Sequence, residues 1–130
     1  MRLRAHHVGI IVGDLEASKA FYGALGFETV SEMDDGTKTI CFMELGGFRL
    51  ELFAYDEAVT AAIETGARRL GFRHLALRTD DIDGALEQLR SAGLAGPDMA
   101  VREVPGLARL LFIRDPDGLE VEIMEDLGAG

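Results

Sequence analysis

The chain has 130 residues, with 13 basic and 23 acidic side chains and a formal net charge of −10. A chain of this length buries roughly two thirds of the surface of its unfolded form, so it needs no disulfide or metal to fold. The acidic balance argues against nucleic acid and anionic membranes as partners, because both repel a negative surface. With Cys41 as its single cysteine, the chain has neither a disulfide framework nor a thiolate-rich zinc site.

The hydrophobic residues are spread along the chain. No apolar run reaches the ~18 residues that a membrane-spanning helix requires. The segment from Met1 to His7 lacks the apolar stretch and the small-residue cleavage site of a secretory signal. These features predict a cytoplasmic protein.

An internal repeat organises the chain, with matched positions 67 residues apart. The matched residues are a histidine, an acidic residue and a glycine: His7 with His74, Asp14 with Asp81, and Gly26 with Gly93. Each acidic residue is placed to cap the start of a helix, and each glycine is placed to end it in a left-handed conformation. The two halves are therefore predicted to fold alike.

The first half begins with a strand pattern, followed by a helix between Asp14 and Gly26 and then by three further strands. The strands are predicted over 6–12, 29–33, 38–45 and 48–53. The second half repeats this order, with a helix between Asp81 and Gly93 and strands over 72–79, 99–104, 107–114 and 119–125. The prediction is an α+β fold of two βαβββ modules that form curved mixed sheets.

The segment between the two halves has an apolar stripe that includes Val59 and Ile63, which predicts a connecting helix over 56–70. We therefore expect one domain over 1–130, made of a module of 1–55, the connecting helix 56–70 and a module of 71–127. The residues Cys41, Met33 and Met43 lie in strand patterns and are predicted to be core residues.

Each half carries a histidine in its first strand, His7 or His74, and a glutamate in its last strand, Glu51 or Glu122. Residues two apart in a strand share a face, and these four side chains alternate with apolar ones that suit the helix-covered face. All four are thus predicted to point to the opposite face, which the curved sheets enclose. The alternative is that each one lies on an ordinary solvated face.

If the two sheets face each other, one pocket holds two imidazoles and two carboxylates. A divalent cation would balance the two carboxylate charges, and each neutral imidazole would add a lone pair. Nitrogen and oxygen ligands without thiolate suit Ni, Co, Zn, Mn or Fe. Such an ion polarises a bound carbonyl, and a nearby carboxylate can then move a proton. The pattern predicts one divalent transition metal held by His7, Glu51, His74 and Glu122.

Other polar residues of these strands have a structural interpretation beside a functional one. His6 alternates onto the helix side and is expected to be a core or edge histidine. Arg49 and Arg78 share faces with Glu51 and His74, so each could bind an anionic substrate group or pair with a nearby acid. Glu120 could be a second base on the Glu122 face, but is expected to be solvated.

Several motifs in combination resemble the vicinal oxygen chelate superfamily, also called the glyoxalase/bleomycin resistance/dioxygenase family. They are the opening segment from His7 to Leu15, Phe21-Tyr22, Leu25-Gly26-Phe27, and Asp115-Pro116-Asp117-Gly118 before Glu122. The resemblance covers nearly the whole chain. It implies two βαβββ modules around a metal, usually in a homodimer, and a small-molecule substrate.

Within that superfamily, a His, Glu, His, Glu ligand set resembles glyoxalase I, and here it falls on His7, Glu51, His74 and Glu122. The resemblance implies a metal-dependent lyase or isomerase that chelates its substrate through adjacent oxygens and shifts a proton next to a carbonyl. A metal-bound glutamate moves that proton in glyoxalase I, which makes Glu122 or Glu51 the catalytic base here.

The chain also departs from glutathione-dependent glyoxalases. They have an arginine four residues after the first ligand and an asparagine four residues after the second, where this chain has Ile11 and Tyr55. The enzyme is therefore not expected to be specific for glutathione adducts. The alternatives are an epimerase of 2-substituted acyl thioesters, an extradiol-type dioxygenase, or a non-catalytic protein that sequesters a drug.

Overall fold

The computed structural model describes residues 1–60, 68 and 70–126. The chain divides into two compact units, Met1–Ala62 and Ile63–Gly130. Within the described residues, no helix has the length and apolar character needed to cross a membrane.

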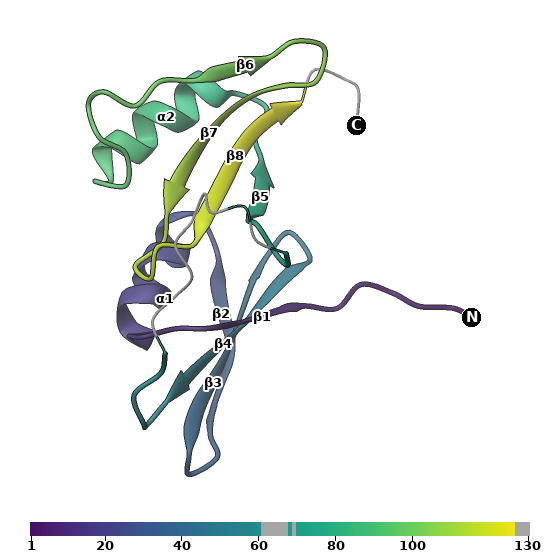
Figure 1. Cartoon of the computed structure of the whole chain (residues 1–130), viewed down its shortest axis with the longest axis vertical. Coiled ribbons are helices and arrows are strands. Elements are labelled where there is room, and N and C mark those ends of the chain that lie inside the picture. Colours follow the sequence, from purple (N-terminus) through teal and green to yellow (C-terminus); the bar gives the residue numbers. More distant parts are fainter. Residues whose placement is uncertain (61–67, 69, 127–130) are drawn as a thin grey trace. The chain divides into compact units, whose positions relative to one another are not determined.

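The first unit contains one βαβββ module (Figure 1). Its elements are β1 (Val8–Ile11), α1 (Leu15–Ala24), β2 (Glu28–Asp34), β3 (Lys38–Leu45) and β4 (Phe48–Tyr55). The strands lie in the order β1-β4-β3-β2, and β1 runs parallel to β4 while the other pairs are antiparallel. The first and last strands of the module are therefore hydrogen-bonded neighbours.

The second unit repeats this module. Its elements are β5 (Leu75–Arg78), α2 (Ile82–Ser91), β6 (Arg102–Val104), β7 (Ala108–Arg114) and β8 (Glu120–Asp126), with the strand order β5-β8-β7-β6. Again the first strand, β5, is parallel to the last, β8. The predicted α+β fold of two βαβββ modules with mixed sheets is confirmed.

Both helices begin and end as the repeat predicts. The Asp14 carboxylate accepts a hydrogen bond from the Ala17 N–H at 3.1 Å, and the Asp81 carboxylate accepts one from the Gly84 N–H at 3.0 Å. After each helix a glycine has a positive φ, 108° at Gly26 and 75° at Gly93. A side chain with a Cβ rarely adopts this conformation, so glycine ends both helices at low cost.

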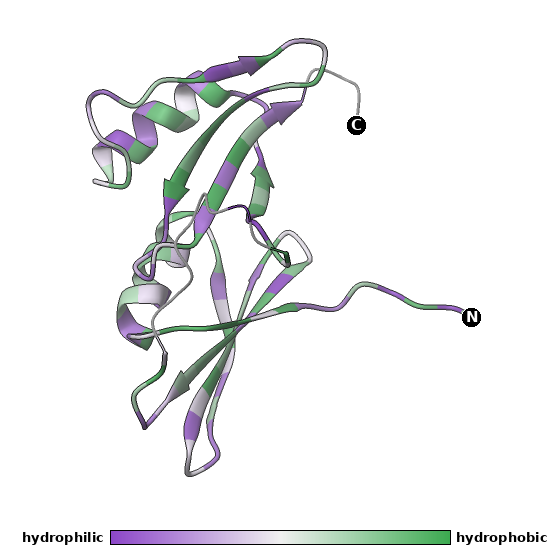
Figure 2. Cartoon of the chain, viewed as in Figure 1, coloured by the Kyte–Doolittle hydropathy of each residue, from purple (hydrophilic) through white to green (hydrophobic). Residues whose placement is uncertain are grey.

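Each unit has a core between its helix and one face of its sheet. In the first unit, Leu50 and Leu52 of β4 are fully buried, opposite Met43 and Cys41 of β3. In the second, Val121 and Ile123 of β8 are buried with residues of β7 and α2, and Figure 2 shows β7 as largely apolar and β8 with hydrophilic residues between its apolar ones. Residues that alternate with these lie on the other face of each sheet.

Three sequence expectations need correction. The prediction of a connecting helix over 56–70 is wrong for residues 56–60, which are not helical. The reason is that β4 continues to Tyr55, and the Asp56 N–H then donates a hydrogen bond to the Thr37 carbonyl at 3.0 Å. Residues 68 and 70 are not helical either, whereas 61–67 and 69 of the expected helix lie outside the described residues. Met33 is exposed because β2 is an edge strand, and His6 is exposed because β1 begins only at Val8.

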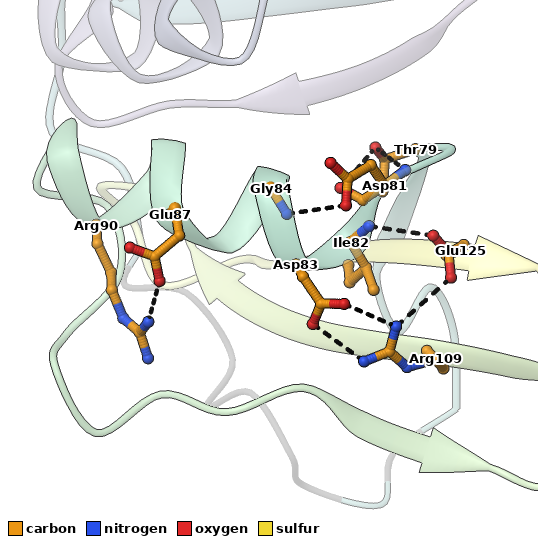
Figure 3. A network of polar contacts seen from close by, with 9 residues as sticks. All are labelled: Thr79, Asp81, Ile82, Asp83, Gly84, Glu87, Arg90, Arg109 and Glu125. Carbon is orange, nitrogen blue, oxygen red and sulfur yellow. Dashed lines mark hydrogen bonds and ion pairs between the residues drawn. The ribbon is translucent and has the colours of Figure 1, made fainter.

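A polar network fastens the start of α2 to its sheet (Figure 3). Arg109 of β7 donates two hydrogen bonds of 3.0 Å to Asp83, and it lies 3.7 Å from Glu125 of β8. The Glu125 carboxylate in turn accepts a hydrogen bond from the Ile82 N–H at 3.2 Å. The bond from Arg109 lowers the pKa of Asp83 below its usual value. Because the folded state favours the charged carboxylate, this interaction stabilises the fold above the unfolded pKa of Asp83 and is lost at lower pH.

We expect Asp83→Asn to destabilise the protein at pH 7, and the difference from wild type to shrink as the pH falls below about 4, the ordinary pKa of an aspartate. Urea unfolding between pH 3 and 7 measures this. Asp80→Asn is the control, because Asp80 is almost fully exposed and lies 3.9 Å from Arg78. A destabilisation by Asp83→Asn that is equally large at pH 3 and pH 7 would contradict the account.

Candidate functional site

In the first unit, His7 and Glu51 lie side by side. His7 directly precedes β1, and Gly9 of β1 is in register with Glu51 of the parallel strand β4. The His7 Nε2 and Glu51 Oε1 atoms are 3.2 Å apart, with 33% of the His7 side chain and 17% of the Glu51 side chain exposed. Leu50 and Leu52 point to the core, which directs Glu51 to the other face of the sheet. The pair is therefore partly exposed to solvent on the sheet face opposite the core.

The second unit repeats this arrangement. His74 directly precedes β5, and Ala76 of β5 is in register with Glu122 of β8. The His74 Nε2 and Glu122 Oε2 atoms are 3.0 Å apart, and 27% and 13% of the two side chains are exposed. The sequence thus predicted correctly that each unit brings a histidine and a glutamate to the face opposite its core.

A phenylalanine supports each pair, and sequence reasoning missed both. Phe42 of β3 is in register with Glu51, and its ring meets the His7 ring edge-on with 5.2 Å between centroids. Phe112 of β7 is in register with Glu122 and meets the His74 ring in the same way, also at 5.2 Å. Such edge-on contacts restrict how the imidazole can turn. Extending the repeat comparison from the outer strands to the middle strands would have found these residues.

The nitrogen–oxygen distances fit two ligands of one metal ion. Ligand atoms at about 2.1 Å from an ion are about 3.0 Å apart when they subtend a right angle, and about 3.4 Å apart at a tetrahedral angle. The distances in the two pairs, 3.2 and 3.0 Å, lie in this range. They also fit a hydrogen bond from an Nε2–H to the carboxylate.

Each pair supplies two ligands of the kind that intermediate transition metals accept, an imidazole nitrogen and a carboxylate oxygen. Among the residues that the structure describes, no group of three or more histidine, cysteine, aspartate or glutamate side chains is placed to hold a metal ion. The observation that carries the site is therefore the duplication of a two-ligand pair.

The outer nitrogens of the two imidazoles differ in their surroundings. For Nε2 to bind a cation, the ring proton must reside on Nδ1. The His7 Nδ1 lies 2.7 Å from the His6 Nδ1, which can accept that proton's hydrogen bond. The His74 Nδ1 is buried and has no hydrogen-bond partner among the described residues. His6, expected in the core or at an edge, instead orients His7.

Three other charged residues considered from the sequence are paired. Arg49 donates a 3.1 Å hydrogen bond to Glu44, and Arg78 lies 3.8 Å from Asp126, so both partner acids. Glu120 was expected to be solvated, but it is buried, with Arg73 at 3.5 Å. It is buried because it lies on the Glu122 face of β8 at the end of the sheet where Arg73 covers it.

Gly9 leaves room for the side chains of Phe53 and Glu51 at the first pair. A Cβ at this position would lie 3.2 Å from the Phe53 ring and 3.6 Å from the Glu51 carboxylate. The equivalent residues in the second unit are Ala76 and Met124. The second unit thus has a Cβ where the first has none, and a flexible methionine where the first has a rigid ring.

Comparisons with known proteins bear on the whole chain. The sequence profile of the Glyoxalase/Bleomycin resistance protein/Dioxygenase superfamily matches residues 4–123. The chain is 34% identical over 126 residues to the uncharacterized protein YaeR of Escherichia coli (strain K12), covering 94% of this chain and 95% of that protein. It is 28% identical over 131 residues to the lactoylglutathione lyase of Salmonella typhimurium, covering 98% and 96%.

Among solved structures, the glyoxalase family protein from Enterococcus faecalis is similar, with a TM-score of 0.77 and 30% identity. The match covers 94% of this chain and 97% of that one. The similarity thus extends through both βαβββ modules and includes the strands that carry the two histidine–glutamate pairs.

We expect Gly9→Ala to destabilise the protein by about 1–3 kcal/mol, because the new methyl group overpacks against Phe53 and crowds Glu51. Adding Phe53→Met should recover more than half of this loss, since it recreates the combination of the second unit. Thermal unfolding measures both variants.

Gly23→Ala is the matched control, because a Cβ at this helical position meets no atom within 4 Å. It should be neutral or stabilise the protein by up to about 1 kcal/mol. The account of Gly9 is wrong if Gly9→Ala is as stable as wild type, or if Phe53→Met adds to the loss.

Proposed function

Because the chain belongs to the Glyoxalase/Bleomycin resistance protein/Dioxygenase superfamily, we propose that it is a divalent-metal-dependent, glyoxalase I-like lyase or isomerase. It chelates a small substrate through adjacent oxygens and shifts a proton next to a carbonyl. The observation that carries this proposal is the duplicated contact of an imidazole Nε2 with a carboxylate oxygen, at 3.2 Å for His7 and Glu51 and 3.0 Å for His74 and Glu122.

In this proposal the two pairs together hold one ion, so that its ligands are His7, Glu51, His74 and Glu122. The charges support this, because two carboxylates balance a divalent cation and two neutral imidazoles add none. The donor set suits Ni, Co, Zn, Mn or Fe. A six-coordinate ion with four protein ligands keeps two positions for a substrate that presents two oxygens.

When bound, the metal supplies Lewis-acid polarisation of the substrate carbonyl, which acidifies the neighbouring C–H. The protein's own groups then do the proton transfer. Glu122 or Glu51 takes the proton from the hydroxyl-bearing carbon next to the carbonyl and returns it to the carbonyl carbon, while the hydroxyl proton passes to the former carbonyl oxygen. The two oxygen-bearing carbons exchange oxidation levels, so the isomerisation needs no external oxidant or reductant. Phe112 and Phe42 contact the neighbouring imidazoles edge-on and restrict their rotation.

Two exposed side chains support a substrate other than a glutathione adduct. Glutathione-dependent glyoxalases have an arginine where this chain has Ile11, whose side chain cannot form a hydrogen bond. They have an asparagine where this chain has Tyr55. The Tyr55 ring is instead covered by Lys38, whose Nζ lies 5.7 Å from the ring centroid. Similarity to the lactoylglutathione lyase of Salmonella typhimurium therefore supports the class of reaction, but it gives less support to glutathione as the thiol in the substrate.

Metal binding is tested by adding Ni²⁺ or Co²⁺ to metal-free protein. At a free concentration of about 100 times the dissociation constant, one bound ion stabilises the folded state by about 2.7 kcal/mol, seen as a rise in Tm. His7→Ala and His74→Ala should each abolish most of this rise, while Glu16→Gln, at an exposed position, should keep it. A wild-type protein without any response, or a His7→Ala variant with the full response, would favour a binding protein that acts without metal.

Mixing the two histidine variants tests whether the ion takes its pairs from one chain or from two subunits of a homodimer. After the His7→Ala and His74→Ala proteins are unfolded and refolded together, a shared site is restored in the mixed dimer, because each subunit supplies the pair that the other lacks. Metal binding recovers only if the pairs come from different chains, and stays lost if one chain supplies both.

The catalytic base is tested with Glu122→Gln and Glu51→Gln. The substrate is first identified by screening 2-oxoaldehyde thiol adducts, 2-substituted acyl thioesters and catechols. Loss of the base should lower kcat by about 10²–10⁴-fold, even when the variant is saturated with metal. Full kcat in both metal-loaded variants would overturn the assignment of the base to this carboxylate pair.

A further inference from the structure

The second unit has a cluster of arginines beside its histidine–glutamate pair. The guanidinium Cζ of Arg73 lies 6.0 Å from the centroid of the Phe112 ring, and that of Arg102 lies 5.9 Å from the same point. The His74 ring is 5.2 Å from this centroid as well. Two cationic side chains therefore surround the ring that supports the proposed metal ligand.

The charges on this sheet face leave a positive excess. Its acids have partners, since Glu120 lies 3.5 Å from Arg73, Asp126 lies 3.8 Å from Arg78, and Glu122 contacts His74. Within the described residues Arg102 has no ion pair, although the chain as a whole carries a charge of −10. A guanidinium left without a carboxylate in so acidic a protein is available to a ligand.

The contact between Arg73 and Glu120 is weak. At 3.5 Å it exceeds the 2.7–2.9 Å of a strong charge-assisted hydrogen bond by more than half an ångström. The Arg73 side chain is 60% exposed, whereas the Glu120 side chain is 11% exposed. The Arg73 guanidinium can therefore bind a ligand while one of its nitrogens stays near Glu120. In this arrangement Glu120 positions Arg73.

The first unit lacks this cluster. The repeat places His6, which contacts His7, where the second unit has Arg73. Among the residues that the structure describes, no guanidinium lies over Phe42, the counterpart of Phe112. The two histidine–glutamate pairs are alike, but their surroundings differ in charge, which suits the recognition of an asymmetric substrate.

We infer that Arg73 and Arg102 bind an oxyanion carried by the substrate, a carboxylate, phosphate or phosphonate. This inference rests on the proposed function for its role in catalysis, because the anion would fix the substrate beside the His74 and Glu122 pair. Arginine suits this role because its planar fork donates two parallel hydrogen bonds to such groups. The substrates sought are thus small oxygen-chelating compounds with a separate anionic group.

The test uses metal-free protein and three probe anions, methylphosphonate, inorganic phosphate and acetate, at low ionic strength. Binding is followed through the Nε–Hε resonances of the arginines in NMR titrations. We expect saturable binding of at least one anion, weakened about 10-fold or more by Arg73→Ala or Arg102→Ala. Arg102→Lys should lose part of the affinity, because it retains the charge but not the fork.

Two further variants give opposite expectations. Arg114→Ala removes a positive charge from the same sheet face without touching Phe112, and should weaken binding less than 2-fold. Glu120→Gln removes the acid that competes for Arg73, and should tighten binding. If all three arginine-to-alanine variants lost the same anion affinity, the loss would reflect the overall charge of the protein, and the inference would be overturned. Unchanged anion binding in Arg102→Ala would overturn it as well.

The same variants separate this inference from the proposed function. Arg73→Ala and Arg102→Ala should bind Co²⁺ as wild type does. If wild-type protein binds the anions as described but no metal, the proposed function fails and the anion site stands. If metal binds and the anions do not, the anion site fails and the metal-dependent function stands.

Discussion

The candidate site depends on the register between the first and last strands of each module. Because β1 is parallel to β4 and β5 is parallel to β8, the residue two positions after each histidine lies opposite a glutamate, as Gly9 does to Glu51 and Ala76 to Glu122. A slip of one residue would turn each glutamate into the core and a buried aliphatic side chain to solvent. Burial of a leucine or isoleucine is worth about 1.5–3 kcal/mol, so the core residues that flank the glutamates hold them in place.

Local polar contacts reinforce this register in the second module. The buried Asp115 carboxylate accepts hydrogen bonds of 2.9 Å from the N–H groups of Asp117 and Leu119, which shape the turn that leads into β8. The network of Arg109 with Asp83 and Glu125 joins β7 and β8 to the start of α2. The helix and the last strand are therefore tied together on the face opposite the histidine–glutamate pair.

The sequence predicted the modules because helix caps and strand alternation are local signals. Asp14, Asp81, Gly26 and Gly93 have the roles that the repeat assigned to them, and the outward direction of Glu51 and Glu122 follows from buried neighbours on either side. The helix expected over 56–70 failed in 56–60 because an apolar stripe cannot show that a strand extends to Tyr55. His6 was misplaced because alternation says nothing outside the strand, which begins at Val8.

The parts of the site that sequence reasoning missed depend on contacts across the sheet. Phe42 and Phe112 occupy matched positions of middle strands, which the repeat marks, but their approach to the histidines follows from the strand order β1-β4-β3 and its repeat, which the sequence does not specify. Arg73 and Arg102 likewise meet at Phe112 from a loop and an edge strand that are far apart in the chain. The two histidine–glutamate pairs were predicted because duplication marks them, whereas the arginines occur in one unit and leave no such signal.

We propose that one metal ion takes two imidazole ligands, one from each module. X-ray absorption of the Ni²⁺-loaded protein tests it most directly, because scattering from imidazole rings counts the histidines around the metal. We predict two imidazoles per ion in the wild type and one in His7→Ala or His74→Ala under saturating metal. A wild-type spectrum without imidazole scattering, or an unchanged spectrum in either variant, would contradict the account.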